Sequence, residues 1–301
     1  MGVKGLYSYL KHYRNYIDPR VVRPMRIGVD AMSLLYRFKC DTKEILYLLS
    51  EMRRVGHTIF FVFDGRPPAE KEREVQNRKD QKTVANAKAE SIKSFLESDA
   101  GSSIDTATRD MLEYSLERCT NQSWHMTRDM RRAFQDELWN ESIPYVKSLS
   151  EADDVLVDLS AAGKIDIVLT TDMDYILSGT KVLWIPTKKD TFFFEEIQLA
   201  DVLTGESLTQ EALLDAGLLC GTEERAGAKG IPCDKAFTLM RYYGSLEAIL
   251  KGNVRDNEIR QMFPNIDAIN SARLTCKPAE NYYSRMIPEH FERVKSFLDT
   301  L

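Results

Sequence analysis

Residues 58–64 read Thr-Ile-Phe-Phe-Val-Phe-Asp, a nearly unbroken apolar run that ends in a carboxylate. Such a run, rich in β-branched and aromatic residues, is typical of a strand covered on both faces of a sheet. The same order, a strand and then an acid, recurs at Arg26–Asp30 and at Ile165–Thr171, which Asp172 follows. Thr42–Val55, between the first two strands, has the apolar period of a helix. The pattern predicts an α/β fold with a mainly parallel sheet.

Acids that directly follow parallel strands are expected at one edge of the sheet, where open α/β folds bind ligands. Each acid alone is also explained as a helix cap or a turn residue, so the repetition carries the prediction. The predicted cluster consists of Asp30, Asp64, Glu151, Asp153, Asp172, Asp174 and Glu223. Converging carboxylates repel one another unless cations neutralise them, and hard divalent cations prefer oxygen ligands. Two such ions about 4 Å apart can support hydrolysis of a phosphodiester. The sequence therefore predicts a Mg²⁺-dependent phosphodiester hydrolase.

The chain changes character after Asp64. Gly65-Arg66-Pro67-Pro68 breaks the α/β pattern, and the residues that follow are rich in charge and poor in strand signals. Helices are expected over 69–96, 106–118 and 127–139, with a flexible loop over 97–105. This segment is predicted to be an insertion that projects from the sheet.

The α/β pattern returns at Ser150, which is expected to cap a helix that ends at Gly163. Further strands are expected at 182–185 and, as a hairpin partner, at 191–194, and helices follow from Thr209 onward. The predicted organisation is a single domain. It has an α/β core (1–65 and 149–208), a helical insertion (66–148) and a helical C-terminal region (209–301).

Composition is that of an ordinary globular protein, with 43% hydrophobic and 29% charged residues. No apolar stretch approaches the roughly 18 residues that a membrane span needs. The net charge is −5, but the balance of the other residues is weakly positive once the seven acids are set aside. The five scattered cysteines predict reduced thiols in an intracellular protein.

Several motifs closely resemble the flap endonuclease/XPG family of structure-specific 5′ nucleases. They are Met1-Gly2-Val3-Lys4-Gly5-Leu6, Val29-Asp30-Ala31-Met32-Ser33, Phe61–Pro68, Ser150-Glu151-Ala152-Asp153 and Thr171-Asp172-Met173-Asp174. The resemblance implies a PIN-like, Rossmann-like α/β nuclease with a helical arch insertion and a C-terminal helix-two-turn-helix region. It implies Mg²⁺-dependent hydrolysis near the 5′ end of flap, nicked or gapped DNA, with two Mg²⁺ ions or Mn²⁺ in their place.

The resemblance also assigns roles by position. The seven acids match the metal ligands of the family, with Glu223 in place of its usual Asp. Lys71 and Arg78 match basic residues at the base of the arch that neutralise the scissile phosphate. The expected DNA-binding residues are Gly2, Tyr36, Gly227, Lys229, Gly230 and Lys235, and the turn at 227–235 matches one that holds a monovalent cation such as K⁺.

Two departures from the family concern partners. The segment between Asp30 and Asp64 is shorter than in cellular flap endonucleases, and no sliding-clamp tail motif is found. The expected partner is branched or nicked DNA, bound by a monomer away from membranes. The expected location is a reducing compartment, the nucleus or a viral replication site. A 5′–3′ exonuclease on duplex ends or RNA and a non-catalytic DNA-junction scaffold are the alternatives.

Overall fold

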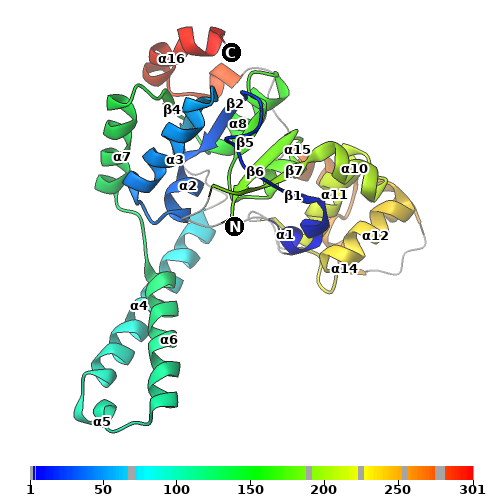
Figure 1. The fold of residues 1–301 in the computed structure, drawn as a ribbon. Helices are drawn as coiled ribbons and strands as arrows, with labels where there is room; N and C mark the ends of the chain where they lie inside the picture. Colours follow the sequence, from blue (N-terminus) through cyan, green and yellow to red (C-terminus); the bar gives the residue numbers. More distant parts are fainter. Residues whose placement is uncertain are drawn as a thin grey trace. The chain divides into compact units, whose positions relative to one another are not determined.

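A single sheet forms the framework of the first part of the fold. The computed structural model describes residues 3, 5–66, 72–187, 192–222, 227–252, 257–274 and 282–300. Within these residues, seven strands form one sheet in the order β1-β7-β6-β5-β2-β3-β4 (Figure 1). The strands are β1 (Arg14–Ile17), β2 (Arg26–Asp30), β3 (Thr58–Phe63), β4 (Tyr145–Lys147), β5 (Ile167–Leu169), β6 (Val182–Pro186) and β7 (Phe194–Gln198).

Most of the sheet is parallel, as the strand-and-acid pattern predicts. β2 pairs in parallel with β3 and β5, β3 with β4, and β5 with β6. β7 is antiparallel to β6 and to β1. The central strands are apolar on both faces, and β3 is buried from Ile59 to Phe63, which explains its unbroken apolar run.

Helices cover the sheet and continue into the C-terminal region. Those before the insertion are α1 (Leu6–Tyr9), the 3₁₀ helix η1 (Leu10–Tyr13), α2 (Ala31–Arg37) and α3 (Thr42–Arg54). Those after it are α7 (Arg128–Asn140), α8 (Ala152–Ala161), α9 (Asp174–Leu177), α10 (Leu199–Glu206), α11 (Gln210–Cys220), α12 (Cys233–Tyr243), α13 (Leu246–Lys251), α14 (Asn257–Met262), α15 (Ile266–Leu274), η3 (Tyr282–Arg285) and α16 (Pro288–Thr300). None of the described helices has both the length and the apolar character needed to cross a membrane.

The chain forms two compact units, one of residues 1–68 and 129–301 and the other of residues 69–128. In the second unit, α4 (Glu72–Leu96) and α6 (Thr106–Ser123) run side by side and are joined through α5 (Asp99–Ser102) (Figure 1). This unit lies inside the predicted insertion 66–148 and is shorter, because α7 belongs with the sheet. Phe134 of α7 is buried and meets Phe61 of β3 edge to face.

The fold class is confirmed, and the strands and helices differ from expectation mainly at their ends. The expected flexible loop 97–105 contains the short helix α5, which forms because the Ser98 hydroxyl accepts a hydrogen bond from the Gly101 amide. The predicted helix 106–118 continues to Ser123. A hairpin partner of β6 is present, but it is β7 (Phe194–Gln198), which overlaps the predicted range 191–194 only at Phe194.

The predicted N-cap at Ser150 is wrong. Helix α8 is capped at Glu151, whose side chain makes no capping bond. The Ser150 carbonyl instead accepts a hydrogen bond from the Gly65 amide at 2.6 Å. The Asp64 carboxylate takes over the capping role by accepting from the Ala152 amide at 2.9 Å.

Candidate active site

Three predicted acids stand at the carboxyl ends of neighbouring strands. Asp30 is the last residue of β2, Asp64 directly follows β3, and Asp172 lies shortly after β5. Because β5, β2 and β3 are adjacent and parallel, these ends lie along one edge of the sheet. The structure therefore places these three acids along the same edge, as the sequence predicts.

Asp30 shows how closely the acids approach one another. Its Oδ1 accepts from the Ser33 amide at 3.0 Å, and its Oδ2 accepts from the Thr170 hydroxyl at 3.0 Å and the Tyr175 hydroxyl at 3.3 Å. Burial, and then the negative charges of Asp64 and Asp172, raise the pKa of Asp30 to about 7. The carboxylates are thus near enough to oppose each other's ionisation.

Tyr175 lies among these acids. Its side chain is only 3% exposed, and burial raises its pKa well above the ordinary value. Asp30, Asp153, Asp64 and Asp172 raise it further through their negative charges. One hydroxyl is within electrostatic reach of four carboxylates. Asp30, Asp64, Asp153 and Asp172 therefore form one cluster.

The start of α8 is joined to this cluster through Asp64. The hydrogen bond from the Ala152 amide to Asp64 Oδ1 fixes the first turn of the helix, which carries Glu151 and Asp153. Asp153 Oδ1 accepts from the Asp154 amide at 2.8 Å.

Asp174 extends the cluster towards the N-terminal segment. Its amide donates to Asp172 Oδ1 at 3.0 Å, so the two acids of the Asp-Met-Asp turn are held together. Its Oδ1 accepts from the Val3 amide at 2.6 Å. The neighbouring Gly2, predicted to contact DNA, lies outside the described residues.

The acids fit a hard divalent cation in their chemistry. In the described part of the chain, no group of three or more His, Cys, Asp or Glu side chains is already arranged to hold a metal ion. The donors are nevertheless carboxylate oxygens, the ligands that Mg²⁺ and Mn²⁺ prefer. The raised pKa of Asp30 shows that negative charge is crowded here, and a bound cation would relieve that crowding.

Three other predicted residues cannot be placed together with the cluster. Glu223, the least typical of the predicted ligands, and Lys71, of the predicted arch, both lie outside the described residues. Arg78 lies on α4 in the second unit, where its side chain is half-buried. The roles of all three stay predictions.

Tyr36 lies on α2, the helix that begins directly after Asp30. Its side chain is 43% exposed, so its ring is available to solvent at the surface. Core packing, the alternative explanation for this aromatic residue, does not account for that exposure.

Residues 227–232, which lead into α12, include two glycines with strict backbone requirements. Gly230 has a positive φ of 75°, and a Cβ on Gly227 would lie 2.3 Å from the Cys220 carbonyl oxygen. Lys229 and Lys235 are both exposed. The two glycines are thus required by the backbone itself, and DNA binding by this turn stays a prediction.

The sequence prediction missed three polar residues that organise the acids. Thr170 and Tyr175 donate to Asp30, and the Ser33 hydroxyl accepts from the Thr171 amide at 2.7 Å. Thr170 offered a signal, because it lies two residues before Asp172 at the end of an apolar strand. Tyr175, which is followed by Ile176 and Leu177, offered no such signal.

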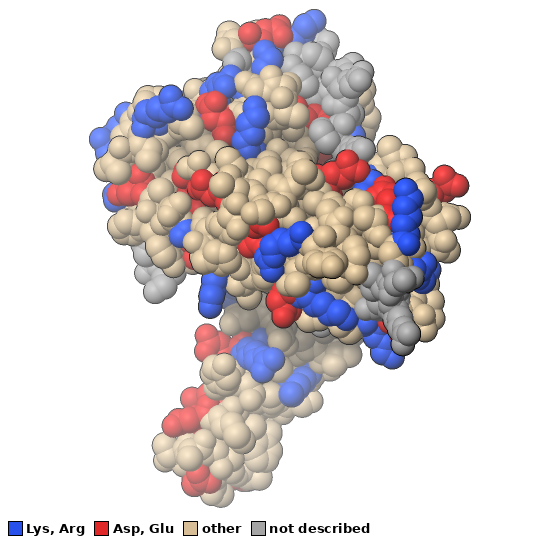
Figure 2. Space-filling model, turned by 90° about the vertical axis from the view of Figure 1, so that its right-hand side faces the viewer, with Lys and Arg blue, Asp and Glu red and all other residues tan. Residues whose placement is uncertain are grey.

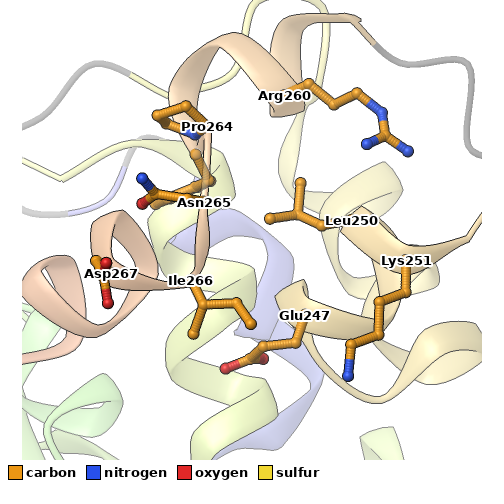
Figure 3. A pocket seen from close by; sticks show the side chains of 9 residues that line it. Glu247, Leu250, Lys251, Arg260, Pro264, Asn265, Ile266 and Asp267 are labelled. Carbon is orange, nitrogen blue, oxygen red and sulfur yellow. The ribbon is translucent and has the colours of Figure 1, made fainter.

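The surface charge on one face of the molecule is mixed. On the face shown in Figure 2, Lys and Arg side chains are interspersed with acidic ones. A recess of about 540 Å³ lies among α13, α14 and α15, with Arg260 and Lys251 on one side and Asn265 and Asp267 on the other (Figure 3). None of the recess's lining residues belongs to the acid cluster. We therefore take the acid cluster as the candidate active site.

Comparison with known proteins agrees with this arrangement. The XPG I-region family model matches residues 142–223. Flap endonuclease 1-2 of Paramecium tetraurelia is 30% identical over 295 residues, covering 87% of this chain and 70% of the relative. Flap endonuclease 1 of Eremothecium gossypii is 25% identical over 279 residues, covering 83% of this chain and 68% of the relative.

The fold is also found among solved structures. The catalytic core of Rad2 (complex I) superposes with a TM-score of 0.63 at 16% identity, covering 94% of this chain and 88% of that one. The extent of the match to the Paramecium protein, together with the shared fold, shows the relationship. The chain belongs to the flap endonuclease/XPG family of structure-specific 5′ nucleases.

Proposed function

We propose that the chain is a Mg²⁺-dependent nuclease that hydrolyses phosphodiesters near the 5′ end of flap, nicked or gapped DNA. The observation that carries the proposal is the placement of Asp30, Asp64 and Asp172 at the carboxyl ends of the adjacent parallel strands β2, β3 and β5. The Rad2 catalytic core has been solved in complex with a DNA substrate, which supports DNA as the partner.

The proposed ligands of two Mg²⁺ ions are the six described acids and Glu223. Divalent ions held there supply Lewis acidity and neutralise charge that develops on the phosphodiester. The chain's own part is to hold the carboxylates in position: Ser33, Thr170 and Tyr175 donate to Asp30, and the Ala152 amide donates to Asp64.

Further proposed roles concern the DNA. Lys71 and Arg78 neutralise the scissile phosphate, and Tyr36 stacks on a base as the terminal nucleotides unpair. Gly227, Lys229, Gly230 and Lys235 contact the phosphate backbone of the duplex, with K⁺ as the proposed bridging cation. We also propose that the protein acts as a monomer in a reducing compartment, the nucleus or a viral replication site.

The test is single-turnover cleavage of three 5′-labelled DNAs, a flap, a nicked duplex and a blunt duplex, in Mg²⁺ and in EDTA. Release of an intact flap only in Mg²⁺ is the expected result. Mononucleotide products would favour the 5′–3′ exonuclease, and binding without cleavage would favour the scaffold.

Asp172→Asn is the matched variant for that assay. It removes one negative charge from the cluster but keeps an oxygen that can accept from the Asp174 amide. Cleavage is expected to fall by at least about 100-fold. The dissociation constant for DNA should stay the same or decrease, because repulsion of the phosphates is reduced. Cleavage near the wild-type rate would contradict the assignment of the site.

A further inference from the structure

A segment far along the chain lies against the helix that carries two of the acids. Ile287 donates from its amide to the Lys147 carbonyl at 2.9 Å, and Ser148 and Met286 form an antiparallel bridge. The Leu149 amide then donates to the Arg285 carbonyl at 2.8 Å. Residues 285–287 thus pair with residues 147–149, which join β4 to α8.

The side chain of Arg285 reaches α8 itself. Its guanidinium forms ion pairs with Asp154 and with Asp158, the latter with 3.2 Å between Nε and Oδ2. These two acids are four residues apart and so share one face of the helix. The Asp158 side chain is fully buried, and a buried carboxylate is costly unless a cation accompanies it. Arg285 supplies that cation.

On their other side, residues 148–150 are held by the residues that follow Asp64. The Gly65 amide donates to the Ser150 carbonyl, and the Arg66 amide donates to the Leu149 carbonyl at 3.2 Å. A Cβ on Gly65 would lie 2.1 Å from the Ser148 carbonyl oxygen, so the two segments touch backbone to backbone. Residues 148–152 are therefore held between the end of β3 on one side and residues 285–287 on the other.

Glu151 and Asp153 are carried by this clamped segment. Helix α8 has Glu151 as its N-cap, and the Glu151 side chain makes no capping hydrogen bond. Its first turn is anchored from outside, by Asp64 through the Ala152 amide and by Arg285 through the Asp154 carboxylate.

We propose that Arg285 is a positioning residue of the metal site, which holds the first turn of α8 so that Glu151 and Asp153 face the other acids. The inference rests on the proposed function, because it takes the acids to be metal ligands. Arg285 acts through its ion pairs with Asp154 and Asp158.

The experiment measures Mn²⁺ binding by calorimetry without DNA, for the wild-type protein and for Arg285→Ala and Arg285→Lys. Loss of a group that orients metal ligands typically weakens metal affinity about 10- to 100-fold, and Arg285→Ala is expected in that range. Arg285→Lys keeps the charge but not the paired geometry of the guanidinium, so an intermediate affinity is expected.

Arg26→Ala is the matched control. Arg26 also pairs with an aspartate, Asp166, through two nitrogens at 3.0 and 2.7 Å, but at the amino end of β2. It should leave Mn²⁺ affinity unchanged, and thermal melting without metal shows how much fold stability each variant loses. Equal weakening by Arg26→Ala, or wild-type affinity in folded Arg285→Ala, would overturn the proposal.

Asp154→Asn provides a second test that leaves the Arg285–Asp158 pair in place. It should weaken Mn²⁺ binding by less than Arg285→Ala does. The double variant Asp154→Asn/Arg285→Ala should lose less affinity than the sum of the two single losses. Full additivity would count against action through Asp154. Failure of the wild-type protein to bind Mn²⁺ or to cleave DNA would instead contradict the proposed function.

Discussion

Asp30 is a residue whose environment favours catalysis over stability. Its carboxylate is buried and lies near other carboxylates, which together raise its pKa to about 7. In the absence of metal the folded protein therefore holds a proton on Asp30 that the unfolded chain releases near pH 4. Folding stability contributed by this residue is present below about pH 4 and is lost as the pH rises towards 7.

Asp30→Asn should consequently stabilise the metal-free protein at about pH 8, where wild-type Asp30 is ionised. Asn keeps an oxygen for the Ser33 amide, and the hydroxyls of Thr170 and Tyr175 can rotate to accept from its NH₂ group. Melting temperature in EDTA should rise by about 2–4 °C for each kcal/mol relieved. The gain should shrink at about pH 5, where the wild-type residue is protonated. A gain of the same size at both pH values would show that ionisation of Asp30 is not the cause.

At the scale of elements, Arg273 joins three helices of the C-terminal region. Its side chain is 4% exposed and donates to Asp215 on α11 at 2.8 and 2.6 Å and to Glu247 on α13 at 2.7 and 2.9 Å. These hydrogen bonds, with Asp215 first, raise the pKa of the guanidinium. Asp215 also accepts from the Leu246 amide at the start of α13.

Arg273→Met should destabilise the protein by about 3–5 kcal/mol, because it leaves the fully buried Asp215 without its cation. The free energy of unfolding in urea measures the effect. Arg54→Ala is the comparison, since Arg54 is 64% exposed and pairs with Glu51 on the surface. It should cost about 0–1 kcal/mol. Similar losses for the two variants would mean that burial of the network does not matter.

Elements that carry local signals were predictable, and contacts between distant segments were not. The strand before Asp30 and the strand before Asp64 follow from apolar runs that end in acids, and the structure confirms both strands. The clustering of those acids also follows, because parallel strands end at a common edge. Arg285 carries no such signal, since its role depends on a backbone pairing with Leu149 that sequence periodicity does not encode.

At the scale of the whole molecule, the two compact units divide the predicted roles. All seven strands and the six described acids belong to the first unit, while Arg78 belongs to the second. The second unit packs its own helices, with Ala85 and Ala89 buried on α4. Each unit therefore has contacts of its own.

Replacing residues 72–127 with a short Gly-Ser linker should leave the first unit folded and able to bind Mn²⁺. Cleavage of a flap should fall by at least about 100-fold, because Arg78 is lost. Circular dichroism, calorimetry and the single-turnover assay measure the three properties, with full-length Asp172→Asn as the inactive reference. Wild-type cleavage by the shortened protein would rule out a role for Arg78 in the reaction.

The strand order has a consequence for how the chain matures on the ribosome. β2 can pair early with β3, but its other neighbour is β5, where Ile27 pairs with Ile167. Arg14 of β1 pairs with Ile197 of β7, so β1 and one edge of β2 have no partner until much later parts of the chain are synthesised. Pairings of such long range form slowly, and unpaired apolar strands are prone to aggregate in the meantime. The helices of residues 69–128, whose contacts are local, emerge during that interval and can form first. Slower translation after residue 63, or a chaperone that covers β2 and β3, should therefore change the yield of soluble protein. The same changes should have a smaller effect on a chain whose strands pair locally.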